Sequence, residues 1–161
     1  MNRLLILPVL LLTLLVGTPA FSADFQKGTA AVKSIDWALA LHEWTPLAKQ
    51  GDIRAQFNLG KIYFKGWGVP QDYKTAGKWY RLAAERGDAR AQTQLSAMYA
   101  GGRGVIKDYV YAHMWGNIAL SNGNKGGGKG RDIVAKGMTT SQIETAQKLA
   151  RECVRKKYKG C

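Results

Sequence analysis

The sequence predicts an all-α fold, a short solenoid of stacked helical hairpins. The first observation is an internal repeat: residues 48–83 and 84–119 are two copies of one 36-residue unit and agree at 16 positions. A fixed period of this length is typical of a solenoid, in which each unit buries its apolar face against its neighbours. The second observation is that apolar residues within each copy recur every three or four positions, as on one face of a helix.

Each copy is predicted to hold two helices joined by a glycine-rich loop. In the first copy Gly51 suits the left-handed end of a preceding helix, and Asp52 suits an N-cap. Gly66 and Gly68 interrupt the first helix, and Asp72 caps the second. The second copy repeats these positions with Gly87, Asp88, Gly102, Gly104 and Asp108.

Both copies contain the string A-x-x-G-D-x-x-A-Q-x-x-L-x-x-x-Y-x-x-G-x-G-V-x-x-D-Y-x-x-A-x-x-W, which begins at Ala48 and again at Ala84. In this string the chain resembles the Sel-one-like repeat family, relatives of the tetratricopeptide repeats. The resemblance implies a right-handed α-solenoid of helical hairpins. It also implies a non-enzymatic protein whose usual work is to bind a protein or peptide partner.

The flanking segments are predicted to be altered units that cap the solenoid. Residues 24–47 are expected to form an N-terminal hairpin of tetratricopeptide type. Residues 120–161 are expected to form a Gly/Lys-rich loop, a helix that begins near Arg131, and a last helix opened by a capping box of Thr139 and Gln142. The loop contains the spacing G-x-x-x-x-G-K at residues 123–129, but Gly130 follows it and no strand precedes it, so a nucleotide site is not predicted.

Residues 1–23 are predicted to be a cleaved secretory signal peptide. Arg3 precedes an apolar run at residues 4–16, and small residues follow it. The run is shorter than the roughly 20 residues that a spanning helix needs. The mature chain is therefore expected to be periplasmic or secreted, without a transmembrane segment. In an oxidising compartment the only two cysteines, Cys153 and Cys161, are expected to form a disulfide.

The charge of the chain favours an anionic partner. Its 24 Lys and Arg exceed its 11 Asp and Glu, for a formal net charge of +13. For an exported protein this favours an acidic protein, a lipid headgroup or a cell-wall polymer over nucleic acid. A basic docking patch, or simply a solvated face, is predicted near the C-terminus at Lys148, Arg151, Arg155, Lys156 and Lys157.

The candidate partner-binding site lies on the first helices of the two copies, which line the concave face in related solenoids. Phe57, Lys61 and Phe64 project opposite the apolar stripe, where two phenylalanines are unusual unless something covers them. The alternative is that Phe57 or Phe64 packs against the neighbouring hairpin. The predicted concave-face site is Phe57, Asn58, Lys61, Phe64, Thr93, Gln94 and Ala97.

No catalytic residue, metal ligand or cofactor is predicted. The only histidines, His42 and His113, have no Cys, His or carboxylate at the spacing of a shared metal site. A triad of Ser96, His113 and Asp108 is not predicted either, because no nucleophile turn surrounds Ser96. The leading hypothesis is a non-enzymatic binding module. One alternative is an envelope hydrolase or β-lactam-interacting enzyme, although the S-x-x-K, S-D-N and K-T-G motifs are absent. The other is a scaffold that docks on anionic cell-wall or lipid surfaces through its basic C-terminal tail.

Overall fold

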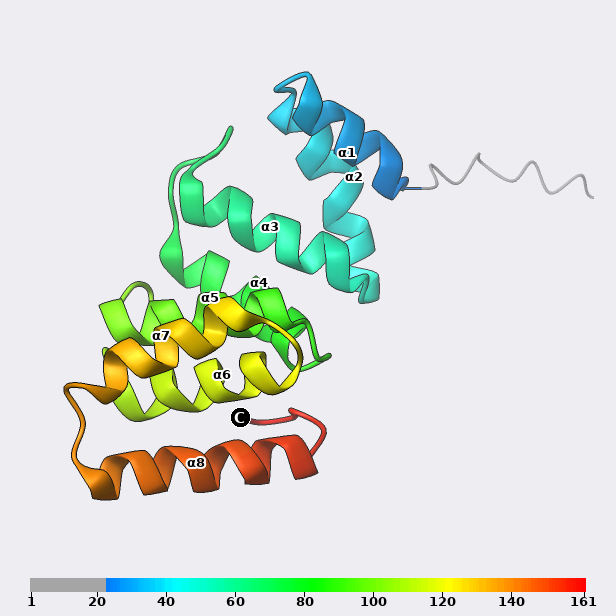
Figure 1. The fold of residues 1–161 in the computed structure, drawn as a ribbon. Coiled ribbons are helices and arrows are strands. Elements are labelled where there is room, and N and C mark those ends of the chain that lie inside the picture. The colour runs from blue at the N-terminus through cyan, green and yellow to red at the C-terminus, as the bar shows by residue number, and fades with distance from the viewer. Residues whose placement is uncertain (1–22) are drawn as a thin grey trace, which may run out of the picture.

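The structure, a computed structural model, describes residues 23–161 and shows eight helices and no strand within them (Figure 1). The predicted all-α class is therefore confirmed. The leader predicted at residues 1–23 lies, apart from Ala23, outside the described residues. The helices are α1 (Phe25–Lys33), α2 (Trp37–Gln50), α3 (Ile53–Lys65), α4 (Tyr73–Ala84), α5 (Ala89–Gly101), α6 (Tyr109–Ser121), α7 (Lys125–Ala135) and α8 (Thr140–Arg155). No helix within residues 23–161 is long and apolar enough to cross a membrane.

The helices stack in chain order. The pairs α1 and α2, α3 and α4, and α5 and α6 pack as hairpins, and each hairpin packs on the next through α2 against α3 and α4 against α5. At the C-terminal end α7 packs on both α5 and α6, and α8 packs on α6 (Figure 1). The last two helices therefore cover the end of the repeat array.

Aspartates begin six of the eight described helices because a carboxylate at the N-cap accepts backbone N–H groups that have no partner inside the helix. Asp52, for example, accepts from the N–H groups of Arg54 and Ala55 at 2.9 and 3.0 Å. All four predicted caps are confirmed, and so is the capping box at Thr139. The six caps are Asp24, Asp36, Asp52, Asp72, Asp88 and Asp108.

The connections inside the hairpins line up along one edge of the solenoid, at the left of Figure 1. Gly66 and Gly102 end α3 and α5, as predicted, and both are in the left-handed conformation, with φ of 70° and 66°. Each later connection lies on the start of the preceding hairpin's second helix. A Cβ added at the connecting glycine would come 2.3 Å from Trp37 at Gly68, 2.4 Å from Tyr73 at Gly104 and 3.4 Å from Tyr109 at Gly137.

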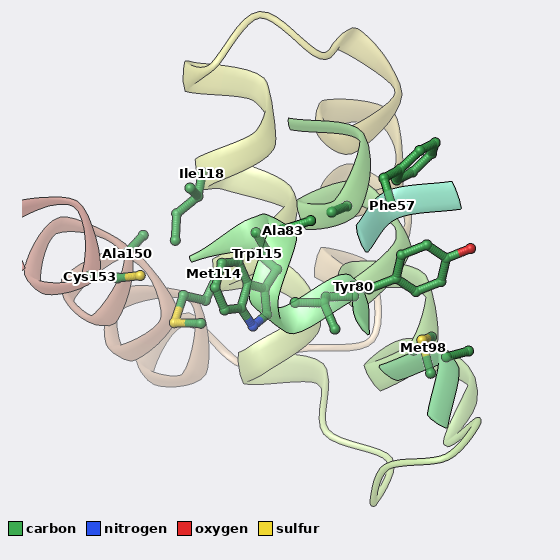
Figure 2. Close-up of a cluster of buried hydrophobic side chains, with 13 residues drawn as sticks. Phe57, Tyr80, Ala83, Met98, Met114, Trp115, Ile118, Ala150 and Cys153 are labelled. Atoms are coloured by element: carbon green, nitrogen blue, oxygen red, sulfur yellow. The ribbon is translucent and has the colours of Figure 1, made fainter. Parts of the chain in front are cut away.

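The larger hydrophobic cluster fills the middle and the C-terminal half of the solenoid. Figure 2 shows its side chains coming from α3, α4, α5, α6 and α8, with Trp115 and Tyr80 almost fully enclosed. Two buried glutamines at equivalent repeat positions tie consecutive hairpins together. The side-chain amides of Gln56 and Gln92 donate to the carbonyls of Ala48 and Ala84 at 3.0 and 3.1 Å.

The Gly/Lys-rich loop predicted before Arg131 is wrong, because a helix, α7, begins at Lys125. Glycine is a poor helix former, but here it permits close packing. Gly127 and Gly128 are buried, and a Cβ added at Gly127 would lie 2.5 Å from the Cβ of Ala119 on α6. The absence of side chains lets α7 approach α6, and this packing offsets the low helix propensity of the run.

The C-terminal tail folds back on the solenoid. The disulfide between Cys153 and Cys161 is present, with 5.5 Å between the Cα atoms. It holds the tail where the Tyr158 hydroxyl donates to the side-chain oxygen of Asn122 at 3.0 Å. The ring of Tyr158 also comes close to Gly87, at the turn between α4 and α5. The tail therefore bridges the ends of α4, α6 and α8.

Candidate partner-binding face

The first helices of the hairpins, α1, α3, α5 and α7, form a surface that we call the first-helix face. It carries a groove of about 450 Å³ between α5 and α7. Most of the residues that line it are small. Its lining is Thr93, Ser96, Ala97, Ala100, Gly101, Arg103, Gly126, Gly130, Ile133 and Val134.

The polar groups of the α5–α7 groove are largely satisfied within the protein. The Thr93 hydroxyl donates to the Ala89 carbonyl at 2.8 Å, and the Ser96 hydroxyl donates to the Ala112 carbonyl at 2.7 Å. Ile133, on α7, is 67% exposed. Arg103 adds a positive charge from the α5–α6 loop. The groove thus offers an apolar floor with a cation at its boundary, which suits an apolar side chain of a partner that carries negative charge nearby.

Two of the predicted site residues, Thr93 and Ala97, line this groove. Gln94 is half-buried on α5 but is not among the lining residues. Sequence reasoning missed the contribution of Arg103, Ile133 and α7. Gly126 and Gly130 are four residues apart, so they lie on one face of a helix. This spacing could have predicted their place in the groove, but the run was interpreted as a loop.

The prediction that Phe57 and Phe64 are open in the groove is wrong. Phe57 is only 9% exposed, and its ring lies 5.8 Å from that of Tyr80. Phe64 is half-buried, with ring centroids 5.0 Å from Tyr73 and 6.3 Å from Tyr80. Arg90, from the next hairpin, covers the Phe57 ring at 4.2 Å. Both rings therefore pack on α4 of their own hairpin, and Arg90 and Arg103 supply the contact with the neighbouring hairpin that the sequence left open as the alternative.

Asn58 and Lys61 lie on the other flank of α3, beside the N-terminal hairpin. They line a cavity of about 50 Å³ together with Trp37, Trp44 and Trp67. Trp37 and Trp67 stack with centroids 4.9 Å apart, and the Lys61 ammonium lies 5.6 Å from the Trp67 ring. A cavity of this size holds about one or two water molecules. Six of the seven predicted residues are thus divided among the α5–α7 groove, the packing of α3 on α4 and a small cavity, and Gln94 lies in none of the three.

The first-helix face carries few acidic side chains. Helices α1, α3 and α5 contain no Asp or Glu, and the only one in α7, Asp132, is paired with Arg131 at 2.7 Å. At the starts of α3 and α5, Arg54 and Arg90 pair with the cap carboxylates of Asp52 and Asp88. The hydrogen bond from Arg54 holds the pKa of Asp52 below its ordinary value.

Three further cations of this surface lie close to aromatic rings. The charged groups of Lys61, Lys65 and Arg103 are 5.6 Å from Trp67, 6.0 Å from Phe64 and 5.9 Å from Phe64. Cations in such positions gain attraction from the ring faces. The carboxylates of this face are those at helix starts and Asp132, which Arg131 pairs, so the face as a whole presents positive charge to a partner.

The predicted basic docking patch is exposed on α8 and at its end, at Lys148, Arg151, Arg155, Lys156 and Lys157. Arg151 also lines a groove of about 300 Å³ between α6 and α8. Because α8 packs on α6, this patch lies on a helix that does not belong to the first-helix face. Its role in docking stays a prediction.

Ser96, His113 and Asp108 are not linked by hydrogen bonds as a catalytic triad would be. The Ser96 hydroxyl is buried and donates to a backbone carbonyl of α6. His113 is buried, and this burial lowers its pKa, an effect that Arg131 increases and Asp132 opposes. Within residues 23–161 no group of three or more His, Cys, Asp or Glu is placed to hold a metal ion.

The stacked 36-residue units define the chain as an α-solenoid of helical hairpins. The Sel1 repeat model matches residues 53–88 and 89–124, which places the start of each repeat at α3 and α5. The chain therefore carries two Sel1 repeats. It is also similar to human "Protein sel-1 homolog 2", with 37% identity over 65 residues, which are 40% of this chain and 9% of that protein.

Two solved structures extend the similarity beyond the two repeats. The crystal structure of c5321, a protective antigen of uropathogenic Escherichia coli with an SLR fold, aligns with a TM-score of 0.76 and 32% identity over 81% of this chain and 30% of that chain. A Sel1 repeat protein from Oxalobacter formigenes aligns with a TM-score of 0.65 and 28% identity over 69% of this chain and 46% of that one. The chain spans less than half the length of each of these three relatives.

Proposed function

We propose that this protein is a non-enzymatic binding module that holds an acidic peptide, or an acidic segment of a protein, on its first-helix face. The α5–α7 groove accepts an apolar side chain of the partner, and Arg103 and neighbouring cations attract its carboxylates. The observation that carries the proposal is the position of an apolar groove on helices that are almost free of acidic residues. Protein binding is also the usual role of Sel1 repeats.

We also propose that the protein works in the periplasm or outside the cell. The sequence of residues 1–23 supports this location, and so does the Cys153–Cys161 disulfide, because disulfides persist mainly in oxidising compartments. Fractionation of the producing cell and the intact mass of the recovered protein test this directly. A mature N-terminus at residues 21–24 is expected, and a protein that stays in the cytoplasm with Met1 would contradict the location.

The binding proposal is tested with defined peptides. A random library of short displayed peptides is selected on the purified protein, and the affinities of the enriched peptides are measured by fluorescence anisotropy. We expect enrichment of peptides that combine Asp or Glu with one aliphatic or aromatic residue. Their affinity should fall with added salt, because charge attraction between exposed groups is screened.

Ala97→Trp is the variant that closes the groove, because Ala97 is an exposed lining residue of α5. Ala38→Trp is its matched control, since Ala38 is an exposed alanine on α2. We expect Ala97→Trp to weaken peptide binding tenfold or more and the control to leave it unchanged. Equal affinity of both variants would show that the α5–α7 groove is not the binding site.

A further inference from the structure

The edge of the solenoid that carries the connections inside the hairpins has a composition unlike the rest of the surface. We call it the connection edge and define it as residues 33–37, 65–74, 102–108 and 136–139. The packing of Gly68, Gly104 and Gly137 on the preceding hairpins makes these four segments one continuous row (Figure 1). Arg103 is the one residue that this row shares with the lining of the α5–α7 groove, and a role of the connection edge does not depend on the proposed function.

Two isoleucines on the connection edge project into solvent. Ile106 is 89% exposed and Ile35 is 72% exposed, the two highest values among the large hydrophobic side chains described as exposed. Ile35 also has a φ of 62°, in the left-handed region where a β-branched residue is disfavoured and glycine fits without strain. Contacts within the protein do not account for an isoleucine at either position, because both side chains are exposed. At position 35 the backbone conformation also disfavours isoleucine.

Cations surround the two isoleucines. The connection edge contains three acidic residues, Asp36, Asp72 and Asp108, and each accepts N–H groups as the N-cap of α2, α4 or α6. It contains twice as many basic residues, all exposed: Lys33, Lys65, Lys74, Arg103, Lys107 and Lys136. The edge therefore combines isolated projecting apolar side chains with an excess of positive charge.

From this combination we infer that the connection edge docks on an anionic lipid bilayer, with Ile35 and Ile106 inserted among the headgroups. A bilayer surface matches both the apolar and the basic side chains of the edge. Its acyl chains accept single apolar side chains, and its anionic headgroups attract Lys and Arg. A protein partner is less well matched, because the two isoleucines lie on different hairpins with the α3–α4 loop between them rather than in one pocket.

The inference is tested with vesicles of phosphatidylcholine alone and of phosphatidylcholine with roughly one-third phosphatidylglycerol, an anionic lipid. Partition coefficients are measured by co-sedimentation at sub-saturating lipid. All variants share the N-terminus that the producing cell generates, so any affinity of the N-terminal segment cancels in their ratios. We expect the parent protein to prefer the anionic vesicles and to leave them as salt is added.

The apolar contribution is read from the double variant Ile35→Gly with Ile106→Ser. Removal of both side chains should lower the partition coefficient on anionic vesicles about tenfold or more. Ile35→Gly alone should raise the melting temperature while it weakens vesicle binding, because glycine relieves the left-handed strain. Such opposite changes separate docking from a loss of folding. Ile133→Ser, at an exposed isoleucine of the groove, is the matched control and should bind like the parent.

The charge contribution is read from Lys65→Gln with Lys107→Gln, which should lower binding to anionic vesicles about tenfold and leave binding to neutral ones unchanged. The matched control neutralises Lys148 and Arg155 on α8. If the α8 variant alone removes binding, the C-terminal tail is the lipid contact and the inference is overturned. The inference is also overturned if the isoleucine variant and the edge-lysine variant bind vesicles as the parent does. It is overturned as well if the parent binds neither kind of vesicle and the connection edge binds an acidic protein instead.

Discussion

Replacement of Gly127 by alanine should destabilise the protein, although alanine is the better helix former. The added Cβ would lie 2.5 Å from the Cβ of Ala119 and 3.0 Å from the carbonyl of Gly116. An ordinary carbon–carbon contact is about 3.5–4.0 Å, and neither neighbour has a torsion that could move it away. Helix α7 must therefore shift by about 1 Å from α6 to reach ordinary contact.

The expected magnitude comes from two opposing effects. Overpacking of a tight site costs about 1–3 kcal/mol of unfolding free energy, and alanine in place of glycine in a helix returns about 0.5–1 kcal/mol. The net loss is then about 1–2 kcal/mol. Gly130→Ala, on the same helix, is the matched control, because its new Cβ would have Ser96 Oγ as nearest neighbour at an ordinary 3.8 Å. It should stabilise the protein by about 0.5–1 kcal/mol.

Urea unfolding followed by far-ultraviolet circular dichroism measures both variants. The midpoints should move in opposite directions at unchanged slope, since the surface exposed on unfolding is the same. Two variants that are both as stable as the parent would mean that residues 125–130 are not packed against α6. That result would restore the interpretation of the run as a flexible loop.

Three further predictions concern packing, protonation and the tail. Phe57→Ala should cost about 3–5 kcal/mol in urea unfolding, because the ring is buried between hairpins; a cost near zero would restore its role as an open groove residue. Burial lowers the pKa of His113, so the unfolded state takes up the proton first as the pH falls. Stability should therefore decline below about pH 6.5, and His113→Gln should lose this part of the dependence when melting is followed against pH. Reduction of the Cys153–Cys161 bond should cost about 2–3 kcal/mol and make both thiols open to alkylation, as intact mass will show.

The features that the sequence predicted correctly are those decided within a few residues of chain. A carboxylate placed just before a helix reaches N–H groups two and three residues further on whatever the rest of the protein does. Asp52 and Asp88 could therefore be assigned as caps from their positions alone. The helix ends at Gly66 and Gly102 belong to the same class, because the left-handed backbone found there favours glycine.

The features that were missed depend on neighbours distant in the sequence. A helical projection assumes one buried face, but α3 packs against both α2 and α4, and Arg90 of the next hairpin covers Phe57. The side opposite the apolar stripe is therefore buried as well. Gly127 is a second example. In the sequence alone its lack of a side chain indicates a loop, whereas in the structure the same lack permits close contact between α7 and Ala119 of α6.

The placement of the acidic residues links the fold to both proposed surfaces. Six of the 11 Asp and Glu are N-caps, so carboxylates are concentrated at the helix starts and are engaged by backbone N–H groups. A seventh, Glu43, is buried and accepts from the backbone N–H of Asp24. None of the Lys and Arg within residues 23–161 is an N-cap, and those of the first-helix face and the connection edge lie on helix faces, at helix ends and in loops. The aspartate caps that start six of the described helices therefore leave the first-helix face and the connection edge positive, and a chain of equal net charge with those carboxylates in the middle of helices would not have this property.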